Sequence, residues 1–186
     1  MIFLTVGSLF SFDRLVKTVD TAVGNGLIQD EVVAQIGYTT FKPKIIRFVK
    51  LLDRTEYQRY IDRADGLISH AGIGTISAAL KHRKPLLVMP RMKRYGEHVN
   101  DHQVATARKF EQLGLVLAAY EPTQLFEKLK ALKTFVPPRR IAQPDLVAAR
   151  ISSFLDALAD SKCPAAATRS EQRRFDVADS SHSIME

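Results

Sequence analysis

The sequence predicts an α/β protein with a Rossmann-like parallel sheet and helices on both faces. Short apolar runs rich in β-branched residues alternate with segments whose apolar residues recur at helical spacing. The spacing between these segments is typical of β-α-β units. Because the crossovers of such units are right-handed, few topologies other than a parallel sheet are possible. At 186 residues, 46% of them hydrophobic, the chain can bury one ordinary core. We expect one domain over residues 1–160 and a disordered tail over residues 161–186, where Ser, Ala, Arg and Asp mix without periodicity.

The expected strands are short apolar runs, each bounded by a turn residue or by a helical segment. Gly7 ends the first run, a loop with Gly37 and Pro43 separates the second from the third, and Pro90 stops the fifth. The strands, in chain order, are residues 2–6, 31–36, 45–51, 66–69, 85–89 and 115–118.

The expected helices are the segments whose apolar residues recur every three or four positions. Ser11 is the expected cap of the first helix, which closes near Gly24, and Gly114 lies just beyond the end of the fourth. Pro137 and Pro138 fall between the last two helices, which follow the sheet. The helices, in chain order, are residues 12–24, 55–64, 74–82, 99–113, 123–132 and 144–158.

Composition limits the possible compartments and binding partners of the protein. The lone cysteine, Cys163, excludes a disulfide framework, so we expect a cytoplasmic protein. The apolar start of the chain lacks the basic segment and cleavage site of a signal peptide, and no run reaches the ~18 apolar residues of a transmembrane helix. Membrane association is therefore expected to be peripheral or through a partner. The net charge of +7 permits a nucleic acid, an anionic membrane or a phosphorylated ligand.

A glycine-containing junction joins the fourth strand to the third helix. The segment SHAGIGT places His70 at the end of the strand and Gly72, Gly74 and Thr75 at the start of the helix. A helix N-terminus at the carboxyl edge of a parallel sheet offers unpaired N–H groups, which favour a phosphate. The pattern is neither the GxGxxG of dinucleotide folds nor the GKS or GKT of P-loops. A tight turn with an internally bonded histidine explains the same residues, so the pattern alone leaves both interpretations open.

A second polar cluster, RMKRYGEHVNDHQ, follows the next strand and should reach the same edge of the sheet. The spacing places Glu97 and Asp101, and also His98 and His102, four residues apart on shared helical faces. Hydrogen bonding to sugar hydroxyls explains the mixture of side chains best. A metal site is a weaker alternative, because a strong zinc signature supplies three ligands at regular spacing. A helix start with capping carboxylates explains the acidic residues but not Gln103 beside two histidines.

Together these stretches, with residues 6–8, 35–37 and 85–91, resemble the glycosyltransferase family 28 C-terminal domain. More narrowly, residues 1–155 resemble the short PssE/EpsE-type proteins of bacterial polysaccharide clusters, which are similar to the eukaryotic Alg13 subunit. The resemblance implies the C-terminal, donor-binding half of a GT-B glycosyltransferase, which typically binds a UDP-sugar.

The resemblance implies where each matching residue lies relative to the donor. Residues expected at the diphosphate are His70, Gly72, Ile73, Gly74 and Thr75. Residues expected in the cleft loop are Gly7 and Ser8. Residues expected at the base, ribose or sugar are Leu51, Arg91, Glu97, His98, His102 and Gln103. Many family members carry a ribose-binding glutamate before the proline that corresponds to Pro85, and this chain has Ala78 there.

The resemblance also implies a two-chain enzyme, a heterodimer that acts at the membrane. The acceptor-binding half is a separate Alg14-like or PssD-like chain, anchored at the inner face of the membrane, and the pair adds a hexose to a lipid-linked precursor of an exopolysaccharide or capsule. Enzymes of this fold are generally metal-independent, so no metal and no cofactor are expected. The catalytic base is expected on the partner.

Two other functions are weighed against this one. The first is a non-catalytic enhancer that stabilises a partner glycosyltransferase without turning over the donor. The second is a nucleic-acid-binding protein, which the positive charge suggests. The basic residues are scattered, however, and no RRM, KH or helix-turn-helix signature occurs, so we expect no nucleic-acid partner.

Overall fold

The computed structural model describes residues 1–138 and 144–162. The chain divides into two compact units, Met1–Arg140 and Ile141–Glu186, and each is described by itself. The first unit contains the sheet, and the described part of the second is helix α6 (Pro144–Lys162). The predicted domain of residues 1–160 spans both units, and most of the predicted tail lies outside the described residues. Both boundaries therefore stay predictions.

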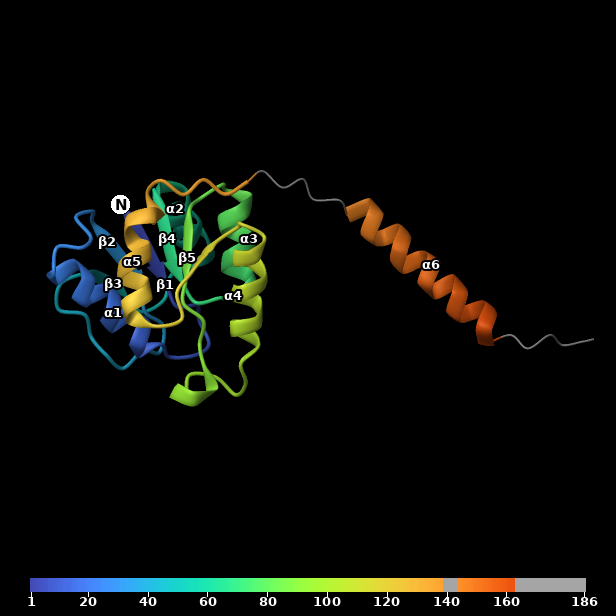
Figure 1. The fold of residues 1–186 in the computed structure, drawn as a ribbon, viewed down its shortest axis with the longest axis horizontal. Helices are drawn as coiled ribbons and strands as arrows, with labels where there is room; N and C mark the ends of the chain where they lie inside the picture. The colour runs from blue at the N-terminus through green and yellow to red at the C-terminus, as the bar shows by residue number, and fades with distance from the viewer. Residues whose placement is uncertain (139–143, 163–186) are drawn as a thin grey trace, which may run out of the picture. The chain divides into compact units, whose positions relative to one another are not determined.

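The sheet is parallel throughout, with the strand order β3-β2-β1-β4-β5-β6 (Figure 1). Each observed strand lies within its predicted run, which confirms the predicted sheet. The order reverses between β1 and β4, and ligands of open α/β sheets bind at such a point, beyond the carboxyl ends of the strands. The strands are β1 (Ile2–Thr5), β2 (Val32–Gln35), β3 (Arg47–Val49), β4 (Gly66–Ser69), β5 (Leu86–Val88) and β6 (Leu117–Ala118).

Helices cover both faces of the sheet, as predicted (Figure 1). Neighbouring residues of a strand face opposite sides, so Leu4 packs under α1 and α5, whereas Phe3 packs under α2, α3 and α4. Both side chains are fully buried, and each such burial contributes roughly 1.5–3 kcal/mol. The helices of this unit are α1 (Asp13–Gly24), α2 (Arg54–Arg63), α3 (Ile73–Lys81), α4 (His102–Gln112) and α5 (Pro122–Leu132).

The predicted cap of the first helix is wrong. Helix α1 begins at Asp13, and Phe12 occupies the cap position without a capping side chain. Ser11 instead presents its carbonyl oxygen to the Nε of Arg91, 3.2 Å away. The N–H of Phe12 donates to Thr39 Oγ1 at 3.1 Å, so a distant side chain satisfies this part of the helix start. The predicted end of the helix near Gly24 is confirmed.

The start of α4 is also later than predicted. The chain forms a short 3-10 helix, η1 (Lys93–Tyr95), and then a left-handed turn at Gly96, where φ is 67°, before α4 begins at His102. The predicted helical faces shared by Glu97 with Asp101 and by His98 with His102 are therefore wrong. The carboxylates of Glu97 and Asp101 accept from the backbone N–H groups of residues 92 and 93, and such local bonds compete with helix formation.

Candidate functional site

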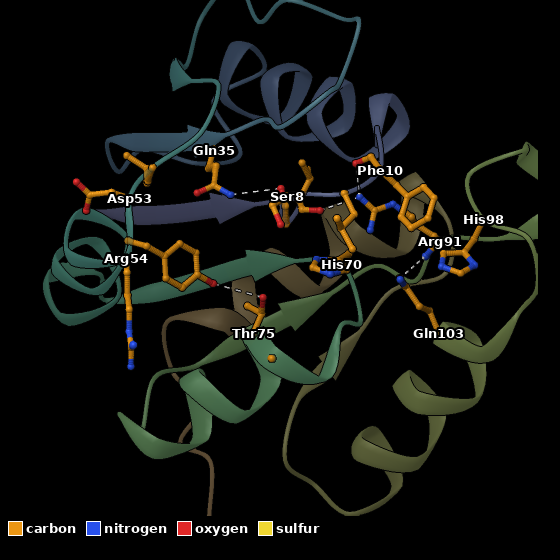
Figure 2. Close-up of a pocket in the computed structure, with 16 residues that line it drawn as sticks. Ser8, Phe10, Gln35, Asp53, Arg54, His70, Thr75, Arg91, His98 and Gln103 are labelled. Carbon is orange, nitrogen blue, oxygen red and sulfur yellow. Dashed lines mark hydrogen bonds between the residues drawn. The ribbon is translucent and has the colours of Figure 1, made fainter.

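A cleft of about 580 Å³ opens at the carboxyl edge of the sheet, where the strand order reverses. Its walls come from the loops after β1, β3, β4 and β5, from the end of β2 and from the first turns of α2, α3 and α4 (Figure 2). The structure thus brings the two polar clusters of the sequence to one place, as the parallel sheet predicts. The predicted site residues that line the cleft are Gly7, Ser8, His70, Gly74, Thr75, Arg91, His98 and Gln103.

His70 lies at the centre of the cleft in a defined tautomer. Its Nδ1 is 3.1 Å from Ser69 Oγ, and the hydroxyl of Ser69 donates to the carbonyl oxygen of Thr5 at 2.8 Å. Because the hydroxyl hydrogen of Ser69 is used in the bond to Thr5, Ser69 Oγ can only accept a hydrogen bond from the ring. The hydrogen of the neutral ring therefore lies on Nδ1, and Nε2 is an acceptor. Burial, followed by the positive charge of Arg91, lowers the pKa of His70 to about 4. His70 is therefore neutral at physiological pH.

Two glycines are required by the position of this ring. A Cβ on Gly72 would lie 2.2 Å from His70 Nε2, and a Cβ on Gly7 would lie 3.0 Å from Cε1 of the same ring. Gly7 also has φ of +78°, which other residues rarely adopt. Gly74, which like Gly72 is expected at the diphosphate, has no neighbouring heavy atom within 4 Å of its Cβ position and lines the cleft.

The N-terminus of α3 meets the cleft without a capping side chain. Gly72 is the cap residue, and its carbonyl accepts the first intrahelical bond, from Ile76. The N–H groups of residues 73–75 belong to the first turn, in which no intrahelical partner exists. Thr75 adds a hydroxyl, 3.4 Å from the hydroxyl of Tyr57. This arrangement of N–H groups, helix dipole and hydroxyl can bind an anion.

The amide side chains in the cleft are bound mainly to the backbone. Gln35 Nε2 donates to the carbonyl of Gly7 at 3.3 Å, and Gln103 Oε1 accepts from the N–H of Arg91 at 3.1 Å. Gln35 is 4% exposed, and within residues 1–138 and 144–162 its Oε1 has no hydrogen-bond partner. Gln35 belongs to the motif at residues 35–37, but spacing gave no reason to expect its side chain in the site.

Glu97 does not line the cleft. Its Oε1 accepts from Arg14 Nε at 2.7 Å, and its Oε2 accepts from Arg14 Nη2 at 2.8 Å and from the N–H of Met92 at 2.9 Å. Both carboxylate oxygens are thus committed to this chain. The structure assigns Glu97 to an ion pair between α1 and the segment before α4.

The two neighbouring histidines differ in position. The ring of His98 lines the cleft between Phe10 and His102, with centroid distances of 5.0 and 4.5 Å. Burial, followed by the charge of His102, lowers the pKa of His98. His102 is exposed, and its Nδ1 is 2.5 Å from Asn100 Oδ1. His102 does not line the cleft, and its ring packs against that of His98.

The start of α2 is a part of the cleft that sequence reasoning missed. Leu52, Asp53, Arg54 and Tyr57 line it, whereas the predicted neighbour Leu51 does not. Asp53 Oδ1 accepts from the N–H three residues later at 2.8 Å and forms a capping box with it. The D-x-x-E spacing was the available signal, because it marks a helix start that the β-α order of the fold places at this edge.

A metal centre finds no support in the part of the chain that the structure describes. Within residues 1–138 and 144–162, no group of three or more His, Cys, Asp or Glu side chains could hold a metal ion. No helix in the same residues has the length and the apolar character that a membrane span requires.

Residues 1–159 match the Glycosyltransferase family 28 C-terminal domain. The chain belongs to this family. Two curated relatives, from Mus musculus and Candida glabrata, are both named UDP-N-acetylglucosamine transferase subunit ALG13 and are 34% identical to the chain. The alignments cover 60% and 58% of the chain, but only 10% of the mouse protein and 52% of the yeast protein.

Two solved structures show the fold of this family 28 domain in other proteins. A glycotransferase of kitacinnamycin has a TM-score of 0.54 and 20% identity, and the match covers 86% of the chain and 39% of that protein. The solution structure of ALG13 has a TM-score of 0.51 and 20% identity, and the match covers 76% of the chain and 90% of ALG13. The predicted equivalence to the C-terminal half of a GT-B enzyme is thus confirmed at the level of fold.

The family 28 resemblance placed more residues in the cleft than the structure does. The residues expected at the diphosphate do not all lie in the cleft. Gly74 and Thr75 line it, whereas Gly72 leaves room for the ring of His70 and Ile73 is exposed. The predicted residues that do not line the cleft are Leu51, Gly72, Ile73, Glu97 and His102. Their contacts with a donor stay predictions.

Proposed function

We propose that the chain is the donor-binding subunit of a two-component GT-B glycosyltransferase, which binds a UDP-sugar and adds its hexose to a lipid-linked precursor of an exopolysaccharide or capsule. One observation carries the proposal: the N-terminus of α3 meets the cleft with no capping side chain. Its N–H groups and dipole suit a diphosphate. The names of the two curated relatives, both UDP-N-acetylglucosamine transferase subunits, support the same class of donor.

The residues of the cleft have separate roles in this function. Gly74 leaves open space for a phosphate at α3, and Thr75 adds a hydroxyl to the same anion. The departing UDP is stabilised by the dipole of α3. These groups can neutralise the charge of the leaving diphosphate, so we propose a reaction without a metal and without a cofactor.

The catalytic base comes from the other chain in this proposal. With a pKa of about 4, His70 is a weak base in the free protein, and its ring is enclosed by Gly7 and Gly72. A base must also reach the hydroxyl of the acceptor, and a single Rossmann-like domain provides one wall of the cleft. The acceptor-binding chain therefore supplies both the second wall and the base.

The proposed partner is an Alg14-like or PssD-like chain anchored at the inner face of the membrane. Leu9, Ile73 and Val99 are 78%, 60% and 73% exposed around the cleft, and covering this apolar surface favours a partner at the carboxyl edge of the sheet. The apolar residues at helical spacing in α6, Ile151 and Phe154 among them, are a second proposed contact. The chain is then cytoplasmic and is recruited to the membrane by this partner.

Two measurements test the proposal. Calorimetry with UDP should show binding by the isolated chain. An assay with radiolabelled UDP-sugars and a lipid-linked acceptor should show transfer only when the partner is added. Transfer by the isolated chain at the rate of the complex would refute the two-subunit arrangement. A complex that transfers sugar while this chain binds no UDP would support the enhancer function instead.

A further inference from the structure

The loop between β1 and α1, residues 6–12, is held from inside the protein by a buried cation. Arg91 follows β5 and is 2% exposed. Its Nη2 donates to the carbonyl oxygens of Val6 and Phe10, both at 2.7 Å (Figure 2). Its Nε donates to the carbonyl oxygen of Ser11 at 3.2 Å. One guanidinium therefore joins the beginning of this β1–α1 loop to its end.

Other bonds fix the ends of the β1–α1 loop but not its middle. The N–H of Gly7 donates to Thr5 Oγ1 at 3.3 Å, its carbonyl accepts from Gln35, and the N–H of Phe12 donates to a threonine. Between these points, Ser8 and Leu9 make no hydrogen bond to any part of the chain that the structure describes. The path of the loop over the cleft thus depends chiefly on Arg91.

The charge of Arg91 is solvated by the loop and not by a carboxylate. Glu97 raises the pKa of Arg91, but its oxygens are hydrogen-bonded to Arg14 and to the N–H of Met92. Burial outweighs this effect and lowers the pKa of Arg91 to about 10, so the guanidinium is charged at neutral pH. The ring of Phe12, 4.9 Å from its Cζ, adds a cation–π contact. Within the described residues, the side-chain hydrogen bonds of this buried cation all go to carbonyls, which favours the loop conformation that supplies them.

Helix α4 holds the arginine itself in place. Its Gln103 accepts from the N–H of Arg91 at 3.1 Å, which fixes the backbone from which the side chain extends. A guanidinium presents five donors in a planar fork, so it can reach three carbonyls at once. A lysine at this position has one nitrogen and cannot reproduce the set.

We propose that Arg91 is a positioning residue for the donor site, which acts on a bound nucleotide sugar through the β1–α1 loop. The sequence resemblance implied a direct contact with the donor instead. Residues 7–10 of the loop form a wall of the cleft, so their conformation sets the shape that a ligand meets. The identity of the ligand rests on the proposed function, whereas the clamp on the loop does not.

The test uses the full-length chain and UDP as the probe. Arg91→Ala should speed amide hydrogen exchange in residues 7–12, leave β1 and β4 protected, and weaken UDP binding about tenfold or more in calorimetry. A low, non-denaturing concentration of guanidinium should restore part of both losses, which a global loss of stability would not allow. Arg91→Lys should fall between Arg91→Ala and the wild type. Arg94→Ala, which removes an exposed arginine three residues later, should match the wild type.

Several outcomes would overturn the proposal. Unchanged exchange in residues 7–12 of Arg91→Ala would exclude the clamp. Weaker UDP binding with an intact, protected loop would show that Arg91 touches the ligand directly. If Arg91→Ala does not fold, Arg91→Lys decides by the same readouts, and wild-type exchange and affinity in that variant would refute the proposal. If the wild-type chain binds no UDP, the proposed function fails, and the exchange comparison still decides whether Arg91 holds the loop.

Discussion

At His70, the packing of one side chain sets its charge and therefore part of the pH dependence of stability. Its pKa of about 4 lies below the ordinary value of 6.5 because the ring is buried. Between these two values the unfolded chain binds more protons at this position than the folded chain does. The folded state therefore has its full stability from this group above pH 6.5 and loses it as the pH falls to about 4.

We predict that His70→Asn flattens this part of the stability profile. Asparagine does not titrate, and its amide can still donate to Ser69 Oγ. The free energy of unfolding of the wild type should fall by on the order of 2 kcal/mol more than that of the variant between about pH 7 and pH 5. Urea titrations at the two pH values measure the difference. Parallel losses in the two proteins would mean that the pKa of His70 is not lowered.

At Gly74, we predict that a side chain interferes with the ligand and not with the fold. The Cβ of Gly74→Val meets no atom within 4 Å, so the variant should fold. It should weaken UDP binding by about 1–3 kcal/mol, comparable to the loss of one or two charge-assisted hydrogen bonds. Ser77→Val, an exposed position in the same helix, is the control for helix propensity. Equal UDP affinity in Gly74→Val and the wild type would exclude a phosphate at this turn.

At the scale of elements, an ion pair ties α1 to the segment that precedes α4. Arg14 also donates to the carbonyls of Pro90 and Tyr120, at 2.9 and 3.0 Å, so one arginine links α1 to the ends of β5 and β6. The side chains of Arg14 and Glu97 are 14% and 9% exposed. Water therefore screens this pair little, and removal of either partner leaves a poorly solvated charge.

We predict that Glu97→Ala lowers the free energy of unfolding by about 2–4 kcal/mol, because Arg14 loses its carboxylate inside the protein. The exposed pair of Arg47 and Glu31, whose side chains are 76% and 53% exposed, is the matched control. Arg47→Ala should change stability by less than about 1 kcal/mol. Denaturant titrations of the two variants test the contrast. Similar small losses in both would show that burial does not strengthen the Arg14–Glu97 pair.

At the scale of the whole molecule, we predict that residues 163–186 add nothing to the stability of the fold. Their composition lacks the apolar periodicity that a packed segment needs. A chain that ends at Lys162 should melt at nearly the same temperature as the full chain in calorimetry. A fall of many degrees would show that the tail packs on the rest of the protein and that its predicted boundary is wrong.

The order of strands and helices followed from local patterns, and so did most helix starts. The cap of α1 and the start of α4 did not. Short apolar runs marked every strand of the sheet. In β1, β2, β4 and β5 the run reflects burial on both faces, whereas the edge strand β3 is largely exposed. Helix ends with a glycine signal, such as Gly114 after α4, were also predictable. The start of α1 depends on a distant partner, because Thr39 satisfies the N–H of Phe12. The entry to β3 does so too, because three successive N–H groups before it donate to Asp20 of α1.

The residues in and around the cleft also divide into those that the sequence placed and those that only the tertiary structure placed. The motif between β4 and α3 placed Gly74 and Thr75 at the carboxyl edge of the sheet, and the family resemblance placed Gly7 there. All three line the cleft, because a parallel sheet brings such junctions to one edge. The spacing of residues in the sequence could not predict the roles of the charged side chains. Arg91 bonds to a carbonyl 85 residues away, and Glu97 pairs with an arginine 83 residues away. Periodicity is a local property of the chain, whereas a buried charge takes the partner that the packing of the sheet places beside it.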